Sequence, residues 1–114
     1  MASTKETLER EIARLRRRYQ HLLGEAVESL EAPCLWDVTA EALCWKVFLD
    51  EVLEPDVDVE FLAEAIVVRG ETAARRLKQA LLPVPTPFNP RRARIRFVAG
   101  VLEIRVQTET AHDR

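Results

Sequence analysis

The apolar side chains follow two different spacings, and these divide the chain into two parts. Over residues 4–31 they recur every three or four positions with charged residues between them, which is the a and d pattern of a heptad repeat. This spacing predicts one long amphipathic helix that begins at Thr4. An isolated helix cannot bury so narrow a seam, so the seam needs a partner, either a second copy or the domain that follows. The seam consists of Leu8, Ile12, Leu15, Tyr19, Leu22 and Ala26.

From residue 34 onward the apolar residues recur at every second position, which is typical of strands with one buried face. The alternation is clearest in "LCWKVFLD" (43–50) and "DVDVEF" (56–61), and a further short strand is expected in "AIVVRGE", stopped at Gly70. The segments "ARIRFV" and "VLEIRV" flank Ala99 and Gly100, which predicts a hairpin with a two-residue turn.

The remaining segments complete the predicted fold. Residues 71–79 fit a short helix or a charged loop, and 81–90 hold four of the six prolines, which suits a sheet edge and turns rather than a central strand. The fold class is therefore mainly β: an immunoglobulin-like antiparallel β-sandwich of six or seven short strands, preceded by a long N-terminal α-helix. The expected segments are a coiled-coil-like helix at 1–32, the sandwich at 34–107 and a short polar tail at 108–114.

Composition excludes several classes of protein. The formal net charge of -2 gives no overall attraction to nucleic acid or to an anionic membrane. No apolar run is long enough to span a bilayer, and the first residues lack the apolar core of a signal peptide, so a cytoplasmic protein is expected. Cys34 and Cys44 fit no zinc or redox spacing and are expected to be reduced and structural. We expect no cofactor and no metal.

No catalytic constellation stands out. His21 and His112 lie far apart in the sequence, and neither serine has a base nearby. The carboxylates of 50–64 alternate with apolar residues, which predicts a solvated strand face rather than an acid–base pair. The sequence also lacks a glycine-rich phosphate loop. It therefore predicts a protein that is not an enzyme.

Basic residues cluster at 14–18, 75–78 and 91–96. They are interpreted as a solubilising surface, because few aromatic residues are interleaved for base stacking and nucleic acid is not an expected partner. The acidic segment 50–64 and the basic segment 91–96 are electrostatically complementary, within one subunit or between subunits.

The order of four motifs resembles the α-crystallin domain of the small heat-shock proteins. These motifs are "VDVEF" (57–61), "IVVRGE" (66–71), "LLP" (81–83) and "GVLEIRV" (100–106), and the resemblance covers about two thirds of the chain. It implies that the sandwich is of the α-crystallin type. It also implies a groove for hydrophobic client peptides between two edge strands, which map here to Val57, Val59 and Phe61 and to Ile95 and Phe97.

The chain also departs from the family pattern. Only eleven residues separate Gly70 from Leu82, too few for the strand-carrying loop that bacterial members exchange to form dimers. The tail after Val106 has no I-x-I motif, the segment that normally links dimers. Because the chain between Gly70 and Leu82 is too short for that loop exchange, the regular seam favours self-association through the helix into a homodimer or homo-oligomer. A client-contacting arm and a helix docked on the sandwich are the alternatives.

The resemblance implies an ATP-independent chaperone, or holdase, that binds partly unfolded proteins through apolar surface. The alternative is a CS-domain-like co-chaperone or a dimeric protein-binding adaptor without general holdase activity.

Overall fold

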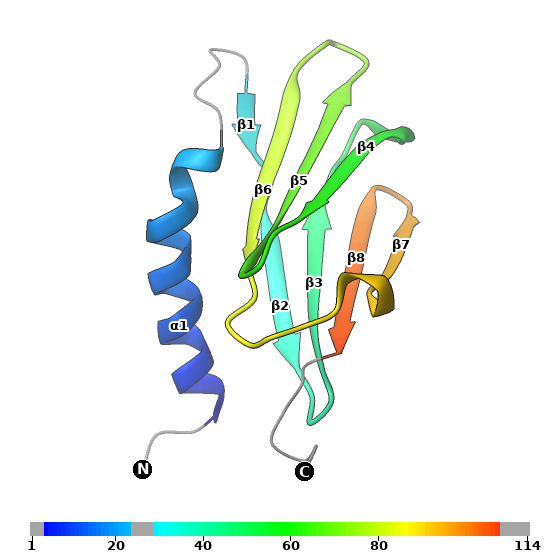
Figure 1. Ribbon diagram of the computed structural model, residues 1–114. Helices are drawn as coiled ribbons and strands as arrows, with labels where there is room; N and C mark the ends of the chain where they lie inside the picture. Colours follow the sequence, from blue (N-terminus) through cyan, green and yellow to red (C-terminus); the bar gives the residue numbers. More distant parts are fainter. Residues whose placement is uncertain (1–3, 24–28, 108–114) are drawn as a thin grey trace.

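The computed structural model describes residues 4–23 and 29–107. Two four-stranded sheets pack face to face, and helix α1 (Thr4–Tyr19) lies along the outer side of the first sheet, beside β6 (Figure 1). The predicted sandwich with a leading helix is confirmed. It contains eight strands in the described residues rather than six or seven, and one strand pair, β1 with β6, is parallel.

The first sheet has the strand order β1-β6-β5-β4, so β4 is one of its edges. Residues 81–83 end β6 beyond residues 77–79, which pair with β1, so among the described strands this part pairs with β5 alone and agrees with the predicted edge position. The strand tolerates proline because Pro83 is its last residue, where the missing N–H interrupts no further ladder. The strands are β1 (Ser29–Glu31), β4 (Val52–Phe61), β5 (Ala65–Thr72) and β6 (Leu77–Pro83).

The second sheet has the order β2-β3-β8-β7, so β7 is one of its edges. All its pairs are antiparallel, and the predicted hairpin is present. Ala99 and Gly100 have φ values of 54° and 81°, which is the left-handed geometry that a two-residue type I′ turn requires. The strands are β2 (Cys34–Val38), β3 (Ala42–Phe48), β7 (Arg94–Val98) and β8 (Val101–Gln107).

The core lies between the two sheets, as the alternation predicts. In β3, Leu43, Trp45 and Val47 are buried, and Leu102, Ile104 and Val106 of β8 meet them from the neighbouring strand. Trp45 also joins the layers, because its indole Nε1 donates a hydrogen bond of 3.1 Å to the carbonyl oxygen of Pro83 in the opposite sheet.

The helix is shorter than predicted. It ends at Tyr19, one 3-10 turn follows (η1, Gln20–Leu22), and residues 29–31 form β1 where the heptad spacing predicts helix. Pairing of β1 with the exposed edge of β6 satisfies backbone groups that a longer helix would leave open. Ala26, the last predicted seam residue, lies outside the described residues.

The connection from β5 to β6 is a tight turn over residues 73–76, so the short-helix interpretation of 71–79 was wrong and β5 continues two residues past Gly70. Thr72 holds the turn: its hydroxyl accepts a hydrogen bond from the backbone N–H of Arg76 at 3.2 Å, and Arg75 takes φ 65°. No room remains here for a strand that could be exchanged with a second copy.

Candidate functional site

The open side of the sandwich is formed by β4 and β7, which are each the last strand of their sheet. Among the described residues, each has one hydrogen-bonded neighbour, β5 or β8, and no strand pairs with the other side of its backbone. β7 lies on the side of the molecule that faces away from α1, and β4 crosses the front of the molecule from beside β6 toward that side (Figure 1). These are the two strands to which the sequence assigns the client groove.

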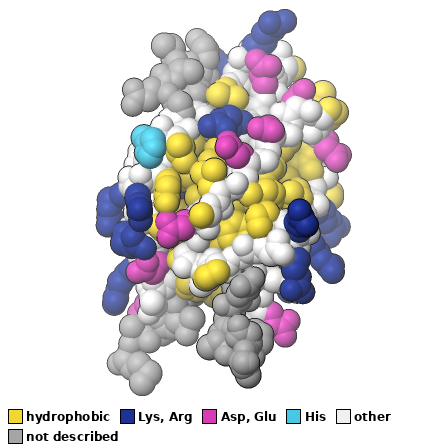
Figure 2. Space-filling model, in the orientation of Figure 1, with side chains coloured by type: hydrophobic (Ala, Val, Ile, Leu, Met, Phe, Trp, Pro, Cys, Tyr) yellow, Lys and Arg dark blue, Asp and Glu magenta, His cyan; other side chains and the backbone are white. Residues whose placement is uncertain are grey.

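All five predicted groove residues lie on this open side. Val57, Val59 and Phe61 of β4 are half-buried and pack against the core between the sheets, as does Phe97 of β7. Ile95 is 47% exposed. Figure 2 shows hydrophobic side chains gathered between β4 and the β7–β8 hairpin, with basic side chains beside them. The five residues thus form the apolar margin of the core along two unpaired strands.

The segment that leads from β6 to β7 covers part of this margin. Phe88 packs against Phe61 with 6.3 Å between ring centroids, and Ala93 also contacts the core. Asn89 shapes the segment, because its Oδ1 accepts a hydrogen bond from the N–H of Arg91 at the start of the 3-10 turn η2 (Pro90–Arg92). The sequence analysis did not assign Phe88 to the margin. The signal was available, since a proline-rich crossover between sheets has to pass over the open side.

Two further apolar side chains of β4 and β7 are exposed, apart from the predicted five. Leu53 in β4 is 67% exposed and Val98 in β7 is 53% exposed. Leu53 lies where the pairing of β4 slips, because Val52 pairs with Thr72 but Val57 pairs with Gly70. A β-bulge changes the direction in which the following side chains point, so the alternating pattern alone did not predict that Leu53 is exposed.

The apolar side chains of the predicted helical seam pack against the β-sandwich of the same chain. Leu15 is fully buried and Ile12 is 7% exposed, while Tyr19 and Leu22 pack against Ala65, Val67 and Leu81 on the outer face of the first sheet. The docked helix was one of the alternatives for this seam. Self-association through it stays a prediction, and it would require these side chains to leave the sheet.

Polar contacts hold the docked helix. The Tyr19 hydroxyl donates a hydrogen bond of 2.6 Å to Glu64, and this bond, with lesser desolvation, raises the pKa of Tyr19. At the end of β1, Arg16 forms an ion pair with Glu31. Arg69 of β5 donates a hydrogen bond of 3.0 Å to the carbonyl oxygen of Leu22, at the end of the helical segment.

A hollow of about 450 Å³ lies between the helix and β2. Cys34 and Trp36 belong to its wall, and Trp36 is 6.4 Å from Trp45 between ring centroids. Burial raises the pKa of the Cys34 thiol, which disfavours the reactive thiolate. Cys34 and Cys44 are both unpaired and half-buried. This hollow therefore offers packing surface rather than an activated nucleophile.

The described ranges 4–23 and 29–107 contain neither a cluster of metal-ligating side chains nor a helix that could span a bilayer. Within them, no three His, Cys, Asp or Glu side chains come together as metal ligands. None of the helices there has the length and apolar character needed to cross a bilayer. His21 is exposed on η1, and His112 lies outside the described residues.

Solved structures share this architecture. Heat shock protein 16.0 from Schizosaccharomyces pombe superposes with a TM-score of 0.68 and 15% identity, covering 90% of this chain and 87% of that one. HSP18.5 from E. histolytica gives 0.64 and 12%, covering 72% and 91%. A variant of hsp14.1 from Sulfolobus solfataricus P2 gives 0.62 and 17%, covering 97% and 95%.

These matches confirm the predicted fold, which is the sandwich of the small heat-shock proteins with an N-terminal helix. No protein-family model matches the sequence, and no curated protein matches it. The similarity therefore lies in the fold of the backbone rather than in the sequence.

Proposed function

We propose that this chain is a divergent small heat-shock protein that holds partly unfolded proteins without ATP. The observation that carries the proposal is the open side of a heat-shock-type sandwich, where β4 and β7 present unpaired backbone next to Val57, Val59, Phe61, Ile95 and Phe97. A client segment placed there would gain backbone hydrogen bonds and bury apolar side chains together.

Binding by this surface selects unfolded chains for a physical reason. Burial of apolar area contributes roughly 25 cal/mol per Å², and only a partly unfolded client exposes apolar segments in extended form. The acidic side chains of β4 and the basic side chains of β7 border the margin and keep the free surface soluble. No nucleotide or metal enters this mechanism, and release follows when the client refolds. We place the protein in the cytoplasm, where such clients arise.

The aggregation of a heat-labile enzyme, followed by light scattering, tests the proposal. The full chain at a near-stoichiometric ratio is expected to slow the aggregation. No protection at about tenfold excess contradicts the proposal, because a holdase acts by mass action.

A matched pair of variants connects this activity to the margin. Ile95 and Val98 are similarly exposed on β7, at 47% and 53%, but they point to opposite faces of the strand. Ile95→Asp is expected to weaken protection several-fold, whereas Val98→Asp is expected to leave it unchanged. Equal effects of the two substitutions would count against this margin as the client site.

A dimeric or co-chaperone-like adaptor without general holdase activity is the second candidate. The tight turn at 73–76 favours this candidate, because it contains no strand that could be exchanged with a second copy. An adaptor would protect no unrelated enzyme and would have one fixed mass. A holdase would protect several enzymes.

A further inference from the structure

The two unpaired edges of the sandwich carry opposite charges in the same alternating order. Along β4, acidic residues alternate with half-buried apolar ones, and along β7 arginines alternate with the exposed Ile95 and the half-buried Phe97. In β4 the sequence is Asp56, Val57, Asp58, Val59, Glu60 and Phe61, and in β7 it is Arg94, Ile95, Arg96 and Phe97. Each edge is therefore apolar toward the core and charged toward solvent.

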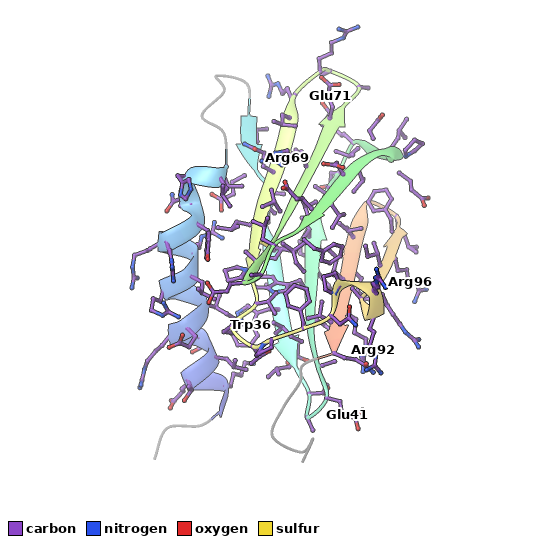
Figure 3. All side chains as sticks on the ribbon, viewed as in Figure 1. Trp36, Glu41, Arg69, Glu71, Arg92 and Arg96 are labelled. Atoms are coloured by element: carbon purple, nitrogen blue, oxygen red, sulfur yellow. The ribbon has the colours of Figure 1, made fainter. Side chains whose placement is uncertain are left out.

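The charged side chains occupy the outer faces of the two sheets. Asp58 lies opposite Arg69, which contacts the end of the helical segment, so the acidic row of β4 faces the helix side. Ile95 lies opposite the buried Ile104, so Arg94 and Arg96 point away from the core. In Figure 3, Arg92 and Arg96 project from the side of the molecule opposite α1.

These charges are poorly matched within one chain. Among the described residues, the ion pair of the β4 row is the one between Glu60 and Arg69, and none joins β4 to Arg94 or Arg96. Arg94 lies directly opposite Arg105, a like-charge pair that destabilises the hairpin. Arg92, Arg94, Arg105 and Gln107 together line a hollow of about 360 Å³ that holds no carboxylate. On the basic edge, Arg96 has Glu103 of β8 opposite it, but Arg94 faces Arg105 and lacks an acidic partner among the described residues. On the acidic edge, Asp56 and Asp58 form no ion pair among the described residues.

We propose that β4 of one copy pairs with β7 of a second copy, edge to edge. A two-fold axis along the strands, at the open side, places the first sheet of one copy beside the second sheet of the other. The outer faces of the joined sheets then coincide, so the acidic row of one copy lies beside the arginines of its partner. The apolar side chains that point inward from β4 of one copy likewise lie beside those of β7 of the other copy, and Ile95 is buried in the interface.

Such an interface closes on itself. Each copy uses β4 in one joined sheet and β7 in the other, so two copies complete the assembly and neither of these two edges remains for a third copy. The partner is a second copy rather than an unrelated acidic protein because the matching charges and the matching alternation occur on the same chain. This dimer covers the edges that we assign to clients, so a client would bind the monomer and compete with the second copy. The test below measures association alone, and its result does not depend on holdase activity.

Sedimentation velocity of the full chain over a range of concentrations tests the proposal. The chain is expected to form a dimer whose dissociation constant rises at least about tenfold between low and high salt, because the paired charges are screened. Arg94→Glu with Arg96→Glu is expected to give monomers, and so is Asp56→Lys with Asp58→Lys. An equal mixture of these two proteins restores opposite charges in both joined sheets, with the original signs in one and exchanged signs in the other, and is expected to form mixed dimers.

A control and a folding check make the result decisive. Arg10→Glu with Arg17→Glu changes the net charge equally at exposed positions of the helix and is expected to leave the dimer intact. Circular dichroism confirms that each variant keeps its strands, and if the Asp58→Lys protein does not fold, Asp56→Lys alone replaces it in the mixture. A wild-type monomer at every concentration overturns the proposal. So does a dimer that survives the Arg94 and Arg96 reversals, or a mixture that stays monomeric.

Discussion

The hydroxyl group of Tyr19 in α1 donates a hydrogen bond of 2.6 Å to Oε1 of Glu64, in the turn between β4 and β5. This contact joins the helix to the sandwich across 45 residues of sequence. It lies beside a small apolar cluster in which Tyr19 and Leu22 cover Ala65, Val67 and Leu81. The helix is thus held on the first sheet by apolar packing with a polar bond at its rim.

Tyr19→Phe is expected to weaken helix docking and to change its pH dependence. The bond to Glu64 raises the pKa of Tyr19 above its ordinary value near 10, because it favours the neutral phenol. The stability from this bond is therefore present below about pH 10 and is lost as the pH rises through the raised pKa. Thermal unfolding followed between pH 7 and pH 11 should show a step in the wild type that the variant lacks. Identical profiles would contradict this role for the bond.

Gly70→Ala is expected to destabilise the first sheet by about 1–3 kcal/mol through overpacking. A Cβ at this position would lie 2.7 Å from Cγ1 of Val52, which packs across the bulge of β4. Val52→Ala removes that atom, so the double variant should lose less than the sum of the two single losses. Denaturant unfolding of the four proteins measures the coupling. Strict additivity would show that the two positions do not meet.

Trp45→Phe is expected to cost about 1–3 kcal/mol, because it leaves the buried carbonyl of Pro83 without the indole donor that joins the two sheets. Trp36→Phe is the matched control, since Trp36 lies at the half-buried margin of the same cluster. Urea unfolding followed by circular dichroism compares the two proteins. An equal loss in both would mean that ring volume, and not the hydrogen bond, sets the cost.

Ala99→Asn is expected to stabilise the β7–β8 hairpin by about 1 kcal/mol. Ala99 takes φ 54°, which is costly for alanine but accessible to asparagine, and asparagine followed by glycine suits a type I′ turn. Ala99→Val is the opposing control and should destabilise the hairpin. Thermal unfolding midpoints that fall for both substitutions would contradict the proposed turn geometry.

The sandwich was predictable because its signals are local. Alternation along 43–50 and 56–61 and the turn at Ala99 and Gly100 each follow from short-range sterics and burial. The end of the helix was not predictable in this way. Residues 29–31 continue a helical pattern, but β1 pairs with β6, and that pairing depends on the position of a strand almost fifty residues away.

The sequence predicted which strands carry the candidate site, but not which of their side chains are exposed. Period two places Val57, Val59 and Phe61 on one face, and the family resemblance identifies β4 and β7 as edges. The exposure of a side chain on an edge strand depends on which other segments pack over that strand. Phe88, in the connection between β6 and β7, packs against Phe61 of β4. The bulge that exposes Leu53 likewise depends on a slip in pairing with β5. Neither effect leaves a pattern within the strand itself.

Site-specific crosslinking to a client tests the central claim most directly. A photoreactive side chain is placed at Ile95, at Val98 or at Leu35 on β2, which are all exposed positions. The chain is then mixed with a heat-denatured enzyme, illuminated and analysed for adducts. The account predicts several-fold more adducts from position 95 than from position 98 or 35. Equal yields at all three positions, or adducts mainly at position 35, would contradict client binding at the β4 and β7 edges.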